Sequence, residues 1–305
     1  MTASVVCFAL AVAACSAQTV RIGVFGLFRP AELRLAALAG GALEVRAGAA
    51  RFVVQDGAAA SIAADNGAIE CRWRGGAVRS QTVTASPRGG AGLVLAVPGK
   101  IERRFSGQLE ITAAAGALEP VIAMDIEVAV ASAVAAESPA NAPIEALKAQ
   151  AVVTRSYYAA AHGRHGAFDF CDTTHCQFLR EPPRAGEPAA RATLETRGLL
   201  LSWNGAPVAA LYTASCGGHT RALDAAPPGD YPYYAVECPT CARGGSVPCA
   251  YCTRTAGAWA NRRGTGAGHG VGLCQTGAAA MAAEGAGFRD ILRYYFPNTA
   301  IEARR

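Results

Sequence analysis

The sequence predicts an α+β fold, in which a small β-rich region at the N-terminus precedes a mixed α/β domain. Across residues 18–120, short runs of apolar and β-branched residues alternate with glycine and Asp-Gly turn signals. From residue 121 the composition becomes rich in Ala, Val and Glu with helical spacing, and short strand patterns return after Gly198. With 305 residues, the chain can bury the core of one large or two modest domains. We therefore expect two domains, at 18–120 and 121–305.

The β-rich region is expected to hold short strands separated by turns. The strands with the strongest pattern are 20–25, 51–55, 68–73, 92–97 and 108–112. No residue in this region carries obvious chemistry, so its predicted role is structural or that of a docking module.

Two helices are expected next. The first, at 125–136, should end near Glu137, because Ser138 precedes Pro139 and proline disfavours helical geometry in the residue before it. The second should begin after Asn141, a good N-cap, and end near Gly163. Its expected buried face consists of Ile144, Leu147, Ala151, Thr154 and Tyr158.

The remaining part of the chain predicts further mixed structure. Residues 199–203 and 208–212 form a predicted hairpin around Asn204-Gly205. Two helices are expected within 276–296, with a break at 285–287.

The first 17 residues resemble a secretory signal peptide. Residues 5–14 form a short apolar run, and cleavage after Ala17 fits the small-residue rule. The segment ending at Cys15 also resembles a lipobox, which would anchor the mature protein by lipid, whereas a retained, buried N-terminus is the alternative because no positive charge precedes the run. We expect export to the periplasm or cell envelope. Since no later stretch holds about 18 uninterrupted apolar residues, the mature chain is not expected to span a membrane.

The charge pattern excludes one class of partner. The formal net charge of +5 is mild and spread along the chain, and no basic tract indicates nucleic-acid binding.

Four segments carry a resemblance to a known family. They are 136–139 (Ala-Glu-Ser-Pro), 145–157, 215–218 (Ser-Cys-Gly-Gly) and 268–278 (Gly-His-Gly-Val-Gly-Leu-Cys-Gln-Thr-Gly-Ala). In this order and spacing they resemble the stage II sporulation protein D and amidase-enhancer family, over roughly Gln108 to Ile301. The resemblance implies a peptidoglycan-associated protein with a glycan-binding groove.

For the sporulation branch the resemblance implies a lytic transglycosylase, which cleaves the MurNAc–GlcNAc bond and leaves a 1,6-anhydro end. The family's catalytic glutamate lies in a Glu-Met-Pro motif that matches Glu137, with Ser138 in the methionine place. Cys274 also departs from the family, which usually has Ser there. The alternative is a non-catalytic peptidoglycan-binding protein that stimulates a wall amidase.

The chemistry of glycoside cleavage supports Glu137 as the acid. A glycosidase ordinarily needs two carboxyl groups, but in an anhydro-forming reaction the sugar's own 6-hydroxyl attacks, so one carboxyl can serve as acid and then base. At a helix C-terminus the dipole disfavours the charged form, so we expect a raised pKa for Glu137. The alternative is a solvated helix-end carboxylate; the other candidate carboxylates are Glu127, Glu145 and Asp172.

Several further residues are candidates for the groove. Lys148, Gln150 and Arg155 could bind sugar hydroxyls or the lactyl carboxylate, or could form the polar side of a half-buried helix. His269 lies in a glycine-rich turn that permits close backbone approach and lacks the Gly-Lys-Ser/Thr ending of a phosphate loop. The resemblance adds Tyr212, Ser215 and Gln275.

Cysteine and histidine residues predict zinc sites, although cysteines in an oxidising compartment would favour disulfides. His165, Cys171, His175 and Cys176 supply four ligands for a structural zinc, and some family members carry zinc at the corresponding positions. A Cys171–Cys176 disulfide is the alternative.

A second zinc site is predicted in a Cys-rich insertion at 238–252. Its CxxC-x7-CxxC spacing is typical of a tetrathiolate, formed by Cys238, Cys241, Cys249 and Cys252. Two disulfides or an iron–sulfur cluster are the alternatives. Cys216 with a histidine could suggest a thiol protease, but a buried structural cysteine is the better interpretation.

Overall fold

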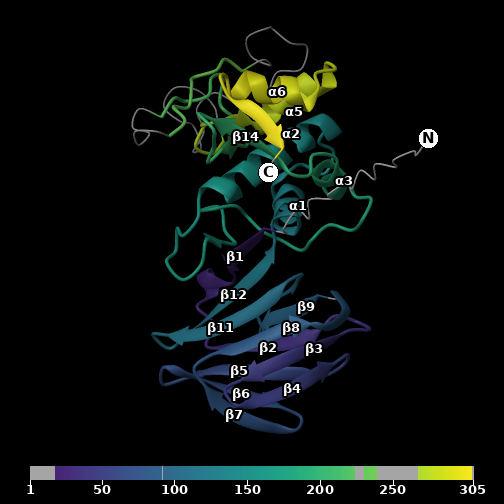
Figure 1. Cartoon of the computed structure of the whole chain (residues 1–305), viewed down its shortest axis with the longest axis vertical. Helices are drawn as coiled ribbons and strands as arrows, with labels where there is room; N and C mark the ends of the chain where they lie inside the picture. Colours follow the sequence, from purple (N-terminus) through teal and green to yellow (C-terminus); the bar gives the residue numbers. More distant parts are fainter. Residues whose placement is uncertain (1–17, 91, 224–229, 239–266, 304–305) are drawn as a thin grey trace, which may run out of the picture.

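A computed structural model describes residues 18–90, 92–223, 230–238 and 267–303, and its fold is α+β, as predicted. The strands of the β-rich region gather at one end of the molecule and the helices at the other (Figure 1). The expected signal peptide with Cys15, and three of the CxxC cysteines (Cys241, Cys249 and Cys252), lie outside the described residues. Within the described ranges, no helix is long and apolar enough to cross a membrane.

The β-rich region consists of two sheets that share one apolar core. The first has the order β13-β1-β12-β11-β8-β3-β4 and the second β10-β9-β2-β5-β6-β7. Their strands, apart from β13, are β1 (Thr19–Gly23), β2 (Glu32–Ala37), β3 (Ala42–Ala47), β4 (Ala50–Gln55), β5 (Ala59–Asp65), β6 (Ala68–Trp73), β7 (Gly76–Ser80), β8 (Val83–Pro87), β9 (Leu93–Val97), β10 (Ile101–Phe105), β11 (Gln108–Ala114) and β12 (Ala117–Asp125). Short 3₁₀ turns occur at η1 (Gly26–Phe28) and η2 (Arg88–Gly90).

Alternation along the strands builds this core. In β3, Leu43, Val45 and Ala47 are buried while the residues between them are exposed, because successive side chains point to opposite faces of a strand. The buried residues of both sheets belong to one cluster. All five predicted strands are present, within a larger set.

The remainder of the described chain is organised around helix α2 (Ile144–Ala160). The other helices are α1 (Ile126–Glu137), α3 (Pro188–Glu195), α5 (Gln275–Ala283) and α6 (Phe288–Tyr295). The short strands are β13 (Phe170–Cys171), β14 (Leu199–Trp203), β15 (Ala206–Pro207), β16 (Tyr212–Thr213), β17 (Leu273–Cys274) and β18 (Ala300–Ala303). The predicted strand at 208–212 is therefore wrong except at its last residue, whereas the two predicted C-terminal helices and their break are confirmed.

Helix α2 lies between two apolar clusters. One of its sides joins the core of the β-rich region together with α1, and the opposite side packs with α5, α6 and β14. From Ala146 to Tyr158 every residue except Lys148 is buried. The prediction of a single buried face is therefore wrong. Because α2 packs against neighbours on both sides, residues around its whole circumference are buried.

The β-rich region continues directly into the helices. Strand β12 runs through residue 120, where the sequence suggested a domain boundary, and ends at Asp125. The Asp125 carboxylate accepts a hydrogen bond from the backbone N–H of Glu127 at 2.7 Å and so caps α1. The start of α1, and with it the position of Glu137, is thus fixed by the last strand of the β-rich region.

Candidate functional site

The candidate site forms at the C-terminal end of α1. The helix ends at Glu137, as predicted, because Ser138 takes the extended conformation that Pro139 demands. Glu137 Oε1 accepts a hydrogen bond of 2.5 Å from the backbone N–H of Phe178. The hydroxyl of Tyr212 lies close enough to the Glu137 carboxylate to stabilise the anion and lower its pKa. This hydroxyl forms no hydrogen bond of ordinary geometry with the described residues.

Burial raises the pKa of the Glu137 carboxyl above its usual range. Burial is the largest influence, and the Phe178 N–H and the Tyr212 hydroxyl oppose it by stabilising the anion. The direction agrees with the prediction, but its cause is loss of hydration rather than the helix dipole. A carboxyl of this kind keeps its proton to a higher pH than an exposed one, as a general acid requires.

Glu137 lines a pocket of about 450 Å³, within the size range of ligand pockets. Its wall is formed by the end of α1, the α1–α2 connection, the start of α2, the residue after β16 and the start of α5. The lining residues are Glu137, Ser138, Pro139, Asn141, Ala142, Pro143, Ala146, Leu147, Gln150, Ala214, Leu273, Gln275, Thr276, Ala278 and Ala279.

Two glutamines join the walls of this pocket. Gln275 Nε2 donates to the backbone carbonyl of Glu137 and to Gln150 Oε1, both at 3.0 Å. Ser138 Oγ donates to the same Gln150 oxygen at 2.9 Å. The Nε2 group of Gln150 is buried and has no partner among the described residues. A buried amide donor without a partner is costly, so Gln150 offers a ready hydrogen bond to a ligand or water.

The segment that presents the Phe178 N–H is anchored to the β-rich region. Asp172 accepts hydrogen bonds from the Phe25 N–H and from Arg103 Nη1, both at 3.1 Å. The guanidinium of Arg103 also lies over the ring of Phe178, 5.9 Å from its centroid. Asp172 therefore anchors this segment and lies outside the pocket wall, and its role as a reserve carboxylate stays a prediction.

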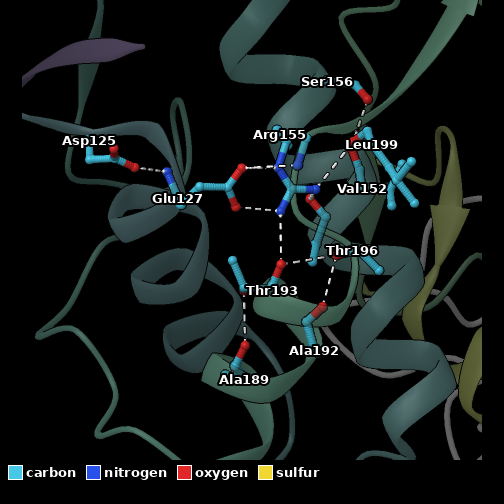
Figure 2. Close-up of polar contacts among 12 residues, drawn as sticks. Asp125, Glu127, Val152, Arg155, Ser156, Ala189, Ala192, Thr193, Thr196 and Leu199 are labelled. Atoms are coloured by element: carbon cyan, nitrogen blue, oxygen red, sulfur yellow. Dashed lines mark hydrogen bonds and ion pairs between the residues drawn. The ribbon is translucent and has the colours of Figure 1, made fainter. Parts of the chain in front are cut away.

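Arg155 does not line the pocket, contrary to the prediction. Its side chain is 2% exposed and forms a bidentate ion pair with Glu127, with distances of 2.8 and 2.6 Å. It also donates to the backbone carbonyls of Leu199 and Thr193, so that it ties α2 to α1, α3 and β14 (Figure 2). Arg155 and Glu127 form a structural ion pair, which removes both from the candidate groups for the chemistry.

Lys148 is likewise committed elsewhere. Its ammonium group lies 2.7 Å from carboxylate oxygens of both Glu145 and Glu195. Glu145 also accepts a hydrogen bond from the N–H of Phe288 at the start of α6. Lys148 does not line this pocket, and its contacts hold α2 against α3 and α6.

The remaining predicted groove residues divide into two groups. Gln150 and Gln275 line the pocket, and Tyr212 lies beside its acid. Ser215 is buried and its backbone pairs with Ala267. His269 is exposed, and its Nδ1 accepts a hydrogen bond from the N–H of Val271 at 3.1 Å. Neither Ser215 nor His269 lines this pocket, and their roles as groove residues stay predictions.

Sequence reasoning missed the Phe178 N–H, which lies 41 residues beyond the acid that it contacts. Its donor is a backbone group, which carries no side-chain signal. Asn141 was predicted only as a helix cap, yet it lines the pocket as well.

The four predicted ligands of the first metal site converge. Ligand atoms of His165, Cys171, His175 and Cys176 all lie within 4.8 Å of one another, with His165 Nε2 3.2 Å from Cys176 Sγ. Both cysteines are free thiols, so the alternative disulfide is not formed here. Two sulfur and two imidazole ligands suit a tetrahedral metal ion, and the set could bind one.

Cys238 belongs to a different cluster. It is the member of the predicted CxxC set that lies within the described residues, and its sulfur is within 4.8 Å of those of Cys216 and Cys274. Cys216 was predicted to be buried, but its side chain is only half-buried.

The fold and site define an α+β protein with a half-buried acid at a helix end, a pocket against that acid and a Cys/His cluster next to it. Residues 114–203 match the sequence model of the SpoIID family, described as stage II sporulation protein. This segment contains α1, α2, Glu137 and the first metal cluster, and the match confirms the family resemblance. The match to this family supports a sporulation role related to the cell wall. No curated protein matches the chain.

Proposed function

We propose that this protein cleaves the glycan strands of peptidoglycan as a lytic transglycosylase, with Glu137 as acid and then base. The observation that carries the proposal is the raised pKa of Glu137 in a pocket wall that, within the described residues, contains no second carboxylate. Ordinary glycoside hydrolysis needs two such groups. An attack by the sugar's own 6-hydroxyl needs only one.

The contacts of Glu137 favour one oxygen as the proton donor. Oε1 accepts the Phe178 N–H at 2.5 Å, so the transferable proton is carried by Oε2. In the proposed reaction Oε2 protonates the leaving glycosidic oxygen, the bond between the anomeric carbon and that oxygen breaks, and the 6-hydroxyl oxygen attacks the anomeric carbon. The carboxylate then takes the hydroxyl proton, which returns the enzyme to its starting state.

The two glutamines supply the proposed recognition of the sugars. The unpartnered Nε2 of Gln150 can donate to a hydroxyl or acetamido oxygen, and Gln275 fixes the orientation of Gln150 by occupying its Oε1. The apolar wall from Ala142 to Leu147 offers contact to sugar rings.

Glu137→Gln tests the catalytic proposal. Purified glycan strands, with and without stem peptides, are incubated with the wild type and the variant, and 1,6-anhydro ends are quantified by mass spectrometry. We expect a loss of about 10²- to 10⁴-fold, the usual contribution of general acid–base catalysis. Glu145→Gln is the matched control, because Glu145 is a nearby carboxylate outside the pocket wall, and it should retain wild-type activity.

The result that contradicts the proposal is a folded wild type that yields no anhydro ends from either substrate. A second candidate function is then favoured, a binding protein that stimulates a wall amidase. Lys148 and Arg155 form ion pairs and do not line the pocket. This supports the second candidate, because fewer polar groups remain for catalysis than the sequence suggested. In that case Glu137→Gln would leave glycan binding and amidase stimulation unchanged.

The Cys/His cluster is proposed to hold a structural zinc ion. Four protein ligands would complete a tetrahedral site, so the ion would order the loop rather than activate water. Cys176 lies two residues before Phe178, so the bound ion would stabilise the segment whose N–H contacts Glu137. Zinc analysis of protein purified without chelator, compared with His175→Ala, tests this. An equal zinc content in both, or a Cys171–Cys176 disulfide in a non-reducing peptide map, would contradict it.

Export and domain organisation complete the proposal. A protein that acts on peptidoglycan must reach the cell envelope, so we propose that residues 1–17 direct export and that 18–120 form a supporting domain for 121–305. Mass analysis of the mature N-terminus distinguishes cleavage after Ala17 from lipidation at Cys15, and an intact Met1 in a cytosolic fraction would contradict export.

A further inference from the structure

Three cysteines from distant parts of the chain meet behind the pocket. Cys216 lies shortly after β16, Cys238 lies 22 residues later and Cys274 ends β17. Their three sulfur atoms are all within 4.8 Å of one another, and Cys238 and Cys274 are fully buried. The fold, rather than local spacing, therefore builds this thiol cluster.

Backbone donors surround the sulfur of Cys274. Its Sγ accepts backbone N–H groups from Cys216 at 3.3 Å and from Gly277 at 3.4 Å. The sulfur also caps the N-terminus of α5, where the helix dipole favours negative charge. Hydrogen-bond donors around a ligating atom are the usual second contacts of a metal-bound sulfur.

A buried hydroxyl gives an independent indication. Tyr295 is 1% exposed, and its hydroxyl has no hydrogen-bond partner among the described residues. It lies close enough to Cys274, Cys238 and Cys216 for negative charge on any of them to act on it. An orphaned buried donor is costly, and a metal-bound thiolate nearby would give it an acceptor.

We propose that Cys216, Cys238 and Cys274 form a second metal site, for a thiophilic divalent cation of the Zn²⁺ class. A cation about 2.3 Å from each sulfur places tetrahedral sulfurs about 3.8 Å apart, which agrees with separations below 4.8 Å. Three adjacent thiolates would repel one another without a cation, whereas the ion offsets their charge and each thiol releases its proton on binding. A disulfide explains the cluster less well, because it would use two sulfurs and leave the third beside it, ready for exchange.

The site would hold together the back of the pocket. Cys274 directly precedes Gln275, which hydrogen-bonds the Glu137 carbonyl and Gln150. Cys216 lies two residues after Ala214, another pocket residue. The ion would therefore fix the two segments that face α2. This inference does not depend on the proposed transglycosylase activity.

The test uses the full chain, reduced with a phosphine and handled without oxygen. Zinc content is measured as purified, and the metal-free protein is titrated with Co²⁺, whose sulfur-to-metal charge-transfer absorption reports thiolate ligands. Cys274→Ser and Cys216→Ser are each expected to lose about one metal equivalent and part of this absorption, as removal of a ligand from a thiolate site should. Cys71→Ser, a buried cysteine outside both clusters, is the matched control and should bind as the wild type.

Combination with His175→Ala separates the two sites, because the losses should add. If Cys274→Ser fails to fold, Cys216→Ser carries the test, since its side chain is only half-buried. Full retention of metal by Cys216→Ser would overturn the proposal and return Cys238 to a site built with the other CxxC cysteines. A disulfide between any two of the three cysteines in protein purified without reductant would overturn it as well.

Discussion

The β-rich region and the helical part of the molecule treat polar groups in opposite ways. Among the described residues, every buried polar or charged residue lies at Ser132 or later, whereas the buried core of residues 19–125 is apolar. The ion pairs within the β-rich region lie at its surface, and each of their side chains is more than a third exposed: Arg21–Glu110, Arg72–Glu70, Arg79–Asp65 and Arg88–Glu44.

This difference shows that buried polar groups, which lower stability unless they are paired, lie in the helical part of the molecule. Strand pairing satisfies the backbone groups of the β-rich region, and its core side chains are apolar. Around α2, by contrast, buried polar side chains cost free energy unless they are paired. The Nε2 atom of Gln150 and the Tyr212 hydroxyl lack hydrogen-bond partners of ordinary geometry there, and both lie beside Glu137. Other unpaired buried polar atoms belong to Gln18, Thr154, Gln177 and Tyr295, so those beside Glu137 are only part of the set.

The largest expected effect comes from breaking the buried ion pair of the helical part. Arg155→Ala should lower the free energy of unfolding by about 3–5 kcal/mol, because it leaves the Glu127 carboxylate without its partner. Urea denaturation followed by circular dichroism measures the change. A loss below about 1 kcal/mol would show that this pair behaves like a surface pair, and the contrast between the two regions would fail.

The sequence predicted the features of this site that depend on local signals. Pro139 fixes the end of α1, and with it the place of Glu137. The Cys/His set was predictable because its four ligands fall between His165 and Cys176, where a single loop brings them together.

Features that depend on packing between distant segments were not predictable from pattern alone. Arg155 and Glu127 are 28 residues apart, and their pairing follows from how α1 crosses α2. The meeting of Cys216, Cys238 and Cys274 likewise needs the fold. Several strands escaped notice because alanine weakens the β pattern, as in the β5 sequence Ala-Ala-Ser-Ile-Ala-Ala-Asp.

A smaller effect is expected at the pocket itself. Because the folded pKa of Glu137 is raised by burial, the folded state binds more protons than the unfolded state between the two pKa values. The wild type is therefore destabilised as pH rises through the folded pKa of Glu137. Glu137→Gln carries no charge, so at neutral pH it should be at least as stable as the wild type.

The advantage of Glu137→Gln should shrink as the pH falls below the ordinary glutamate pKa, where both proteins carry a neutral group. Thermal unfolding of both proteins across this pH range measures it. The opposite result would be a Glu137→Gln protein that is less stable than the wild type, with the largest difference at neutral pH. That result would mean that the ionised carboxylate is well solvated or paired, and it would contradict the view that the helical part buries costly groups.

The smallest effect is expected in the β-rich region. Arg79 Nε lies 2.9 Å from Asp65 Oδ2, a distance similar to those of the Arg155–Glu127 pair, but the side chains are 58% and 40% exposed. Water and salt screen such a pair, so Arg79→Ala should cost only about 0–1 kcal/mol, and less at high salt. Since the two arginine substitutions remove the same kind of group from pairs of similar length, the difference between them isolates burial. Equal losses for Arg79→Ala and Arg155→Ala in the same urea titration would mean that contact distance, and not burial, sets the strength of ion pairs in this protein.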